Sequence, residues 1–260
     1  LANDALSSDC TGFAPVLHPD APIWFNRLID ELQFRAIRRA LELANVSSGA
    51  RILDVGCGTG RWVRRYQHLG LNAMGADATP RMLDVAQKLG TGSRLVAGEA
   101  HLLPFPAGQF DCVTDITVTQ HIPVSLQPQV LGEMLRVLKP GGNLILMELI
   151  RGKGPHIFPR APRDWITQTS YWGAELIAWF GQEYLLPDRL FIRAARTMWR
   201  ASANTPVSLP VSARRHSSAS WRIYWGLRRV TASLSAWTDG LAEVICPGGL
   251  ATHGVFVFRK

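Results

Sequence analysis

The feature that most constrains the fold is a glycine-rich turn between an apolar run and a predicted helix. Residues 51–55, RILDV, have the composition of a short buried strand, and GCGTG follows directly at 56–60. Glycine permits a tight turn and close approach of the backbone to a ligand. The helix that comes next exposes unpaired N–H groups at its start. This order of strand, loop and helix is typical of ligand-binding α/β folds.

Strand and helix patterns alternate along the rest of the first half, which predicts a parallel sheet with right-handed crossovers. The expected class is therefore α/β, a Rossmann-like doubly wound sheet. Helices are expected at 22–44, 60–69, 80–89 and 127–138, and strands at 51–55, 71–77, 94–98, 110–117 and 141–150. The glycines at 141–142 are expected to end a helix and turn the chain. Further on we expect helices at 163–172, 187–202 and 218–237, and strands at 174–181 and 253–260.

Composition excludes several classes of protein. Hydrophobic residues make up 47% of the 260, and charged residues 18%, so extended disorder is not expected. The four cysteines form no CxxC pair, which disfavours a disulfide scaffold and the common zinc spacings, so no metal site is predicted. There is no apolar run of about 18 residues and no recognisable signal peptide. A cytoplasmic protein is the expectation.

Charge is distributed unevenly between the two halves. Residues 1–150 carry 13 Lys/Arg and 14 Asp/Glu, whereas residues 151–260 carry 15 and 6 and seven of the nine tryptophans. In the expected helix 187–202 four arginines form one stripe: Arg189, Arg193, Arg196 and Arg200. An ordinary solvated surface, an anionic ligand, a membrane surface and nucleic acid are all compatible with this basic half.

Acidic residues stand where three consecutive strands should end. Asp54 precedes the glycines, where a carboxylate repels phosphate and suits a cationic ligand. Asp77 ends the next strand and can accept both hydroxyls of a ribose. Glu99 follows the third and can accept from an adenine amino group. Arg61 occupies the place of the last glycine of the dinucleotide fingerprint, which disfavours a nicotinamide cofactor.

Four segments in order, LDVGCGTG, GADATPRML, GEAHLLPFPAGQFD and LRVLKPGG, resemble the class I S-adenosylmethionine-dependent methyltransferases. The most similar group is that of the small-molecule enzymes of methyltransferase type 11, which includes the ubiquinone and menaquinone methyltransferases. The resemblance covers about residues 45–150. It implies a seven-stranded sheet with an antiparallel last strand, S-adenosyl-L-methionine as cofactor and S-adenosyl-L-homocysteine as product. We expect an N-terminal helical lid at 1–45, a cofactor-binding core at 46–181, a helical substrate-side insertion at 182–250 and the last strand at 251–260.

The resemblance also implies roles for individual residues. The glycine loop would pass under the methionine part of the cofactor, with Asp54 near its ammonium, and Asp77 would hold the ribose. The group often has Asp where this chain has Glu99. Ala78 and Met82 would flank the adenine, Glu99 and Ala100 would meet its edge, and Thr117 would line the floor. The implied cofactor set is Asp54, Gly56, Cys57, Gly58, Thr59, Gly60, Asp77, Ala78, Met82, Glu99, Ala100 and Thr117.

Methyl transfer needs an acceptor aligned with the methyl group, and a hydroxyl acceptor benefits from a base. His121 follows the fourth expected strand at the ligand-binding edge and is the candidate base, with a structural histidine hydrogen-bonded at the strand end as the alternative. Trp24, on the N-terminal helix, and Trp172 are candidate substrate contacts, with core packing as the alternative.

These observations predict a methyltransferase that acts on a small molecule, most often at oxygen, such as a natural product, quinone or lipid-like compound. Methylation at carbon or nitrogen stays open. The chain lacks the Asn/Asp-Pro-Pro-Tyr motif and the Pro-Cys nucleophile of base-modifying enzymes. The alternatives are an RNA-modifying methyltransferase, suggested by the basic half, and a non-catalytic cofactor-binding module.

Overall fold

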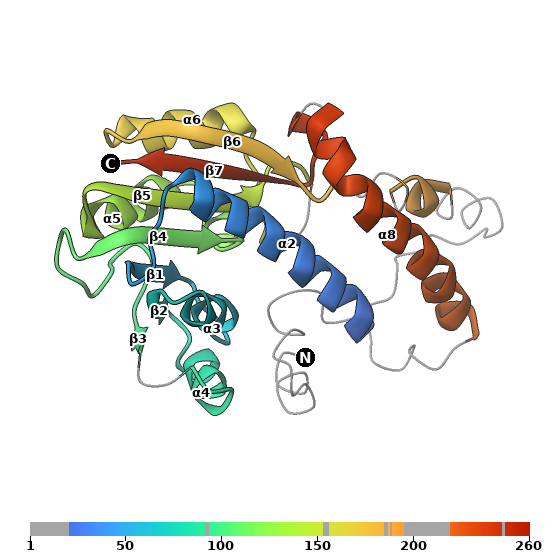
Figure 1. Ribbon diagram of the computed structural model, residues 1–260, viewed down its shortest axis with the longest axis horizontal. Coiled ribbons are helices and arrows are strands. Elements are labelled where there is room, and N and C mark those ends of the chain that lie inside the picture. The colour runs from blue at the N-terminus through green and yellow to red at the C-terminus, as the bar shows by residue number, and fades with distance from the viewer. Residues whose placement is uncertain are drawn as a thin grey trace.

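The computed structural model describes residues 21–91, 94–152, 156–184, 187, 189–194, 219–245 and 248–260. Seven strands form one sheet in the order β3-β2-β1-β4-β5-β7-β6 (Figure 1). Neighbouring strands from β3 to β5 are parallel, and β7 is antiparallel to both β5 and β6. This confirms the predicted α/β sheet with its antiparallel last strand.

The elements lie close to the ranges expected from the sequence. The strands are β1 (Arg51–Val55), β2 (Asn72–Asp77), β3 (Leu95–Ala97), β4 (Phe110–Ile116), β5 (Leu138–Leu149), β6 (Glu175–Gln182) and β7 (His253–Arg259). The α-helices labelled in Figure 1 are α2 (Ile23–Leu43), α3 (Arg61–His68), α4 (Pro80–Lys88), α5 (Gln127–Val137), α6 (Pro162–Tyr171) and α8 (Ala219–Ile245). Short 3-10 turns follow β4 at Thr119–His121 and precede β7 at Gly248–Leu250.

Two differences from the expectation concern element ends. The segment around Gly141 and Gly142 is not a turn after a helix: β5 starts already at Leu138, directly after α5. The amide of Gly141 donates to the carbonyl of Lys260, and the amide of Lys260 donates to the carbonyl of Gly142, so Lys260 holds both glycines.

Helix α8 extends eight residues beyond the expected end at 237. Most of the expected helix 187–202, including Arg196 and Arg200, lies outside the described residues.

Helices cover both faces of the sheet. One face packs against α5 and α6 through side chains such as Leu131 and Trp165. The other packs against α2, α3 and α4, where Ile37, Tyr66 and Leu83 belong to one buried cluster with Ile52 and Val257. The fold is thus a three-layer α/β/α arrangement.

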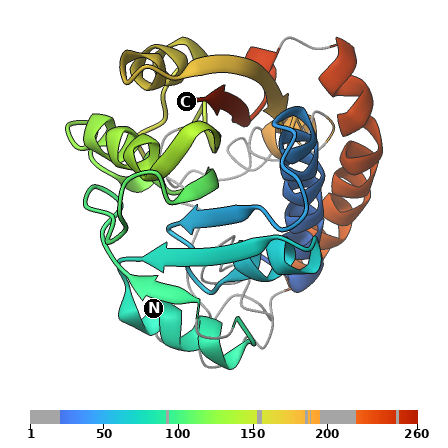
Figure 2. The same cartoon turned by 60° about the vertical axis from the view of Figure 1, so that its left-hand side comes forward.

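Helix α2 extends past the sheet and meets α8 there (Figure 2). Phe25, Ile29 and Leu32 of α2 are buried with Ala232 of α8. Trp225 of α8 lies 5.4 Å from Phe25 between ring centroids. Among the helices that the structure describes, none is both long and apolar enough to cross a membrane.

Candidate active site

The glycine loop joins the end of β1 to the start of α3 at the carboxyl edge of the sheet. Gly56, Gly58 and Gly60 all have positive φ, at 67°, 52° and 73°. A Cβ placed on Gly56 would lie 2.4 Å from a methyl carbon of Val118, so the loop after β4 rests directly on this glycine. The loop therefore needs glycine both for its backbone shape and for this close contact.

Asp77, at the end of β2, supports the same loop. One carboxylate oxygen accepts a hydrogen bond of 2.8 Å from the amide of Gly58, and the other accepts one of 2.8 Å from the amide of Thr79. Each oxygen has a second lone pair. The carboxylate is thus fixed beside the glycine loop and can still accept hydrogen bonds from a diol.

Asp54, at the end of β1, is buried beneath the glycine loop. Its Oδ1 accepts a hydrogen bond of 3.0 Å from the Thr114 hydroxyl. Its Oδ2 is also buried, and no group in the described part of the chain donates to it. Burial raises the pKa of Asp54 to about 8, against the opposing effects of Thr114 and Arg61. An orphaned carboxylate oxygen of this kind fits a cationic group.

The remaining candidate cofactor residues differ in how far their side chains are exposed. Cys57 and Thr59 are buried inside it, and burial raises the pKa of the Cys57 thiol, which disfavours a reactive thiolate. Ala78 and Glu99 are exposed at the ends of β2 and β3, where a ligand could reach them. Met82 on α4 and Ala100 after β3 are half-buried.

Thr117, the expected floor residue, follows β4 with a φ of 60°, an uncommon value for a residue other than glycine. Its amide donates to the Met147 carbonyl at 2.8 Å. The amides of the next three residues all donate to the Glu148 carboxylate, at 3.0, 3.1 and 2.9 Å. The strained backbone is therefore held by a buried acid at the end of β5.

Glu148 has a buried acidic neighbour, Asp115, on β4. The hydroxyl of Thr119 donates to Asp115. Burial raises the pKa of both acids, and each acid also interacts with the other. Sequence reasoning missed both residues. Their positions near the ends of two expected neighbouring strands were the available signal.

His121, the candidate base, is exposed on the 3-10 turn after β4. Its Nδ1 lies 3.2 Å from the carbonyl oxygen of His156, and its Nε2 lies 3.2 Å from Nε2 of Gln120. Both ring nitrogens thus have neighbours within the protein. No acidic side chain in the described residues forms an ion pair with this imidazole.

The two candidate substrate tryptophans lie far from one another. Trp24 is half-buried near the start of α2, with its ring centroid 6.0 Å from that of Trp225. Trp172 follows α6 at the opposite, amino edge of the sheet and packs over Gly132 of α5. The structure therefore separates Trp172 from the carboxyl edge. This position follows from α6, which runs back towards the start of β6, and the expected substrate contact of Trp172 stays a prediction.

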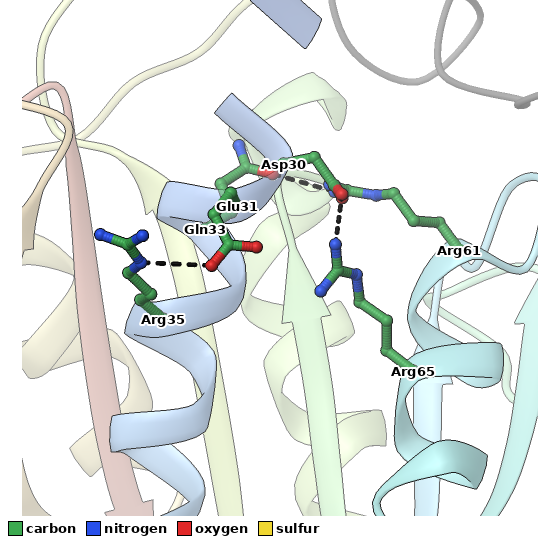
Figure 3. A network of polar contacts seen from close by, with 6 residues as sticks. All are labelled: Asp30, Glu31, Gln33, Arg35, Arg61 and Arg65. Atoms are coloured by element: carbon green, nitrogen blue, oxygen red, sulfur yellow. Dashed lines mark hydrogen bonds and ion pairs between the residues drawn. The ribbon is translucent and has the colours of Figure 1, made fainter. Parts of the chain in front are cut away.

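A buried polar network connects the glycine-loop helix to α2 (Figure 3). Arg61, the first residue of α3, donates to Asp30 at 2.7 Å and to the side chain of Gln33 at 2.9 Å. Arg65 also pairs with Asp30. The side chains of Asp30 and Arg61 are each 7% exposed. The helix that was expected to act as a lid is thus tied to the loop by ion pairs removed from water.

The same network continues to the far strands of the sheet. The amide of Gln33 donates to Glu183 at 3.1 Å, and His253 lies opposite the other Glu183 oxygen. Glu183 directly follows β6, and His253 begins β7. Sequence reasoning missed both. The expectation of an antiparallel last strand was the available signal, since it places the start of that strand at the carboxyl edge.

Two other expectations concern ions. In the described ranges no group of three or more His, Cys, Asp or Glu side chains is arranged to hold a metal. Of the arginine stripe, Arg189 donates to the Leu250 carbonyl at 2.7 Å, so this member is engaged with the protein itself.

Comparison with known proteins identifies the core. Residues 53–146 match the family model of the methyltransferase domain. The chain is 37% identical over 121 residues to the ubiquinone/menaquinone biosynthesis C-methyltransferase UbiE of Pseudomonas fluorescens (strain Pf0-1), covering 43% of this chain and 46% of that one. It is 32% identical over 123 residues to a malonyl-[acyl-carrier protein] O-methyltransferase of Pectobacterium atrosepticum, covering 47% of each.

The chain thus spans about half the length of these relatives. A solved SAM-dependent methyltransferase from Archaeoglobus fulgidus shares the fold, with a TM-score of 0.56 and 15% identity over 89% of this chain and 94% of that one. The matched segment contains the glycine loop, Asp54, Asp77 and β4. Residues 53–146 therefore match a methyltransferase domain, and the sheet that contains them has the fold of a solved SAM-dependent methyltransferase.

Proposed function

We propose that the chain transfers the methyl group of S-adenosylmethionine to a small-molecule acceptor, a phenol or hydroquinone of quinone, natural-product or lipid-like type. The observation that carries this proposal is the buried, unpartnered Oδ2 of Asp54 beneath a glycine loop. A carboxylate there suits the ammonium of the methionine part and opposes a phosphate.

The other residues at this edge fit the same cofactor. Asp77 would accept from the ribose hydroxyls, Ala78 and Met82 would flank the adenine, and Glu99 with Ala100 would meet its edge. Thr117 would line the floor, on a backbone that Glu148 holds in place. The glycine loop would carry the methionine part, since Gly56 leaves no room for a side chain.

The cofactor supplies an activated methyl group bonded to a sulfonium sulfur. The protein's contribution is alignment, exclusion of water and removal of the acceptor proton. Oxygen methylation is the proposed outcome. An ionised hydroquinone is nucleophilic at oxygen and at the neighbouring ring carbon, so the same proton removal serves either product.

A cluster of aromatic side chains on α2 and α8 supports the proposed acceptor class. Helices α2 and α8 bring Trp24, Phe25, Tyr224 and Trp225 together, and such rings pack well against an aromatic or apolar acceptor. The name of one matched relative, a ubiquinone/menaquinone biosynthesis C-methyltransferase, agrees with a quinone-type acceptor.

The experiment is transfer of a tritiated methyl group into two separate pools from the source organism, a total lipid extract and total RNA. We expect label in the lipid extract, and less label with the control variant Asp77→Ala, whose cofactor affinity should be weakened. Label in RNA would instead support the alternative of an RNA-modifying enzyme, suggested by the basic second half, whose binding would depend steeply on salt. Cofactor binding without label in either pool would support a non-catalytic binding module.

A further inference from the structure

We propose that His253, aligned by Glu183, is the base that removes the acceptor's hydroxyl proton, and that Gln182 binds a polar group of the acceptor beside it. This inference rests on the proposed function, because it deepens the chemistry of the same site. The three residues that would contact or orient the acceptor all lie outside the matched methyltransferase segment.

The first observation is the pairing of a buried acid with a histidine. Nδ1 of His253 lies 3.2 Å from Oε2 of Glu183, and their side chains are 10% and 5% exposed. The pair is within ion-pair distance but not aligned as a hydrogen bond. Such pairs commonly tighten only when substrate is bound. With Nδ1 facing the carboxylate, Nε2 presents its lone pair, and no partner in the described residues faces that nitrogen.

The second observation is the strain and support of Glu183. Its φ is 58°, in the left-handed region that an L-residue seldom adopts. The Thr252 hydroxyl donates to the Glu183 carbonyl at 2.8 Å, and Gln33 donates to the carboxylate at 3.1 Å. The surroundings thus fix both the backbone and the side chain of this acid. Sparsely populated backbone held in this way is typical of functional sites.

The third observation is the unsatisfied side chain of Gln182. Both its oxygen and its nitrogen are buried, and neither has a hydrogen-bond partner in the described part of the chain. Gln182 is directly opposite His253 in the β6–β7 pair, so their side chains lie on the same face of the sheet. Buried amides are nearly always paired, so this orphaned amide indicates a ligand that supplies the partners.

The fourth observation is the position of His253 relative to the expected cofactor residues. His253 pairs with Leu149 of β5, two residues beyond Met147, which pairs with Ile116 of β4. His253 is therefore level with the loop after β4 and two strand spacings away, about 10 Å. An acceptor one or two rings wide spans that gap. Gln33 contacts both Arg61 and Glu183, so the glycine-loop helix and the pair share one network.

The proposed step is balanced within these groups. The O–H bond of the acceptor breaks, and its proton goes to Nε2 of His253. The oxygen lone pair forms the bond to the methyl carbon, while the carbon–sulfur bond breaks and its electron pair stays on sulfur. The imidazolium is stabilised by Glu183 and returns its proton to solvent after product leaves. Compared with His121, this histidine has a buried acid behind it and an open Nε2.

A binding experiment without cofactor tests the base directly. The probe is 4-nitrocatechol, whose visible absorbance reports its ionised fraction. We expect wild-type protein to lower the apparent pKa of the bound probe by about one unit, a tenfold effect, and His253→Gln to abolish the shift. Glu183, at the end of β6, is the charged group that faces the histidine, so Glu183→Gln should reduce the shift as well. An equal shift in His253→Gln, or none in wild type, overturns the proposal.

Kinetics then compare the two histidines with 1,4-naphthohydroquinone as acceptor. His253→Gln should lower kcat about 100-fold, with cofactor Kd unchanged within about twofold. His121→Gln should lower kcat less than about tenfold. The reverse order would assign the base to His121. If wild type methylates no acceptor, the proposed function fails, whereas the nitrocatechol titration still decides the inference.

Gln182→Met supplies a variant that does not depend on the histidine. Methionine has a similar shape and no buried amide, so we expect a higher Tm together with a raised KM for the acceptor and a smaller change in kcat. A lower Tm with an unchanged KM would make Gln182 a structural residue and contradict its proposed role.

Discussion

The near half of the carboxyl edge, from β3 to β4, and the far half, from β5 to β6, are built from the chain in different ways. In the near half each functional residue follows its strand directly, so a short stretch of sequence contains both the scaffold and the chemistry. In the far half Gln33, Glu183 and His253 come from three distant segments and meet only through strand pairing and helix packing. The first kind of site can be read as motifs, and the second becomes visible only in the fold.

The largest loss in the free energy of unfolding is expected at the ion pair that connects the two halves. Asp30→Ala removes the partner of Arg61 and leaves that guanidinium buried and uncompensated. Breaking one side of a buried ion pair costs about 3–5 kcal/mol, so we expect a large loss in the free energy of unfolding, measured by urea denaturation.

The neighbouring residue provides the matched control. Glu31 pairs with Arg35 at 3.2 Å, with side chains 50% and 66% exposed (Figure 3). Glu31→Ala should cost about 0.5 kcal/mol or less, because exposed ion pairs contribute little. Equal losses in the two variants would show that the network in Figure 3 does not hold the halves together.

The next effect concerns the junction of β4 and β5. Glu148→Gln takes away a carboxylate that accepts from three consecutive amides, and we expect a loss of about 2–3 kcal/mol. Asp115→Asn resembles the protonated acid and should cost less than about 1 kcal/mol. Thermal melting of the two variants at pH 7 gives the comparison. If Asp115→Asn is the more damaging change, Glu148 is not the acid that holds this junction.

A smaller effect, restricted to cofactor binding, is expected in the near half. Asp77→Ala should weaken S-adenosylmethionine binding by about 1.5–3 kcal/mol, because charge-assisted hydrogen bonds are lost. Isothermal titration calorimetry measures the change, with the exposed Asp84→Ala on α4 as the matched variant. Unchanged affinity in Asp77→Ala would refute the ribose assignment.

The smallest effect is a pH dependence. Burial raises the pKa of Asp54 to about 8, so at pH 6 to 7 this carboxyl carries a proton in the ligand-free protein. Binding of an ammonium favours the ionised form, so affinity for S-adenosylmethionine should rise between pH 7 and pH 8, by up to about 1.4 kcal/mol. Calorimetry in buffers of different ionisation enthalpy should detect proton release, and Asp54→Asn should remove it. An equally steep dependence in Asp54→Asn would place the proton elsewhere.

The sequence predicts much of the fold because its local patterns agree with its global arrangement. Strands 51–55 and 110–117 are short apolar runs with clear boundaries, and the structure places them within a residue of the expected ends. The same reasoning failed for the segment around Gly141, since a pair of glycines is typical of a turn, whereas here Lys260, directly after β7, exchanges backbone hydrogen bonds with it. Glu148 and His253 could not be singled out, because their significance depends on neighbours more than 25 positions away.

The placement of β7 between β5 and β6 has a consequence for the order of folding. β6 has β7 as its hydrogen-bonded neighbour, and β7 reaches β5 across more than a hundred residues of chain. Closing such a loop is entropically costly, and pairings of this kind form late. We therefore expect the near half to consolidate first and β7 to arrive as the last strand, bringing His253 with it. A chain halted just before that step would expose two open strand edges, which makes the insertion of β7 the moment of greatest exposure to aggregation.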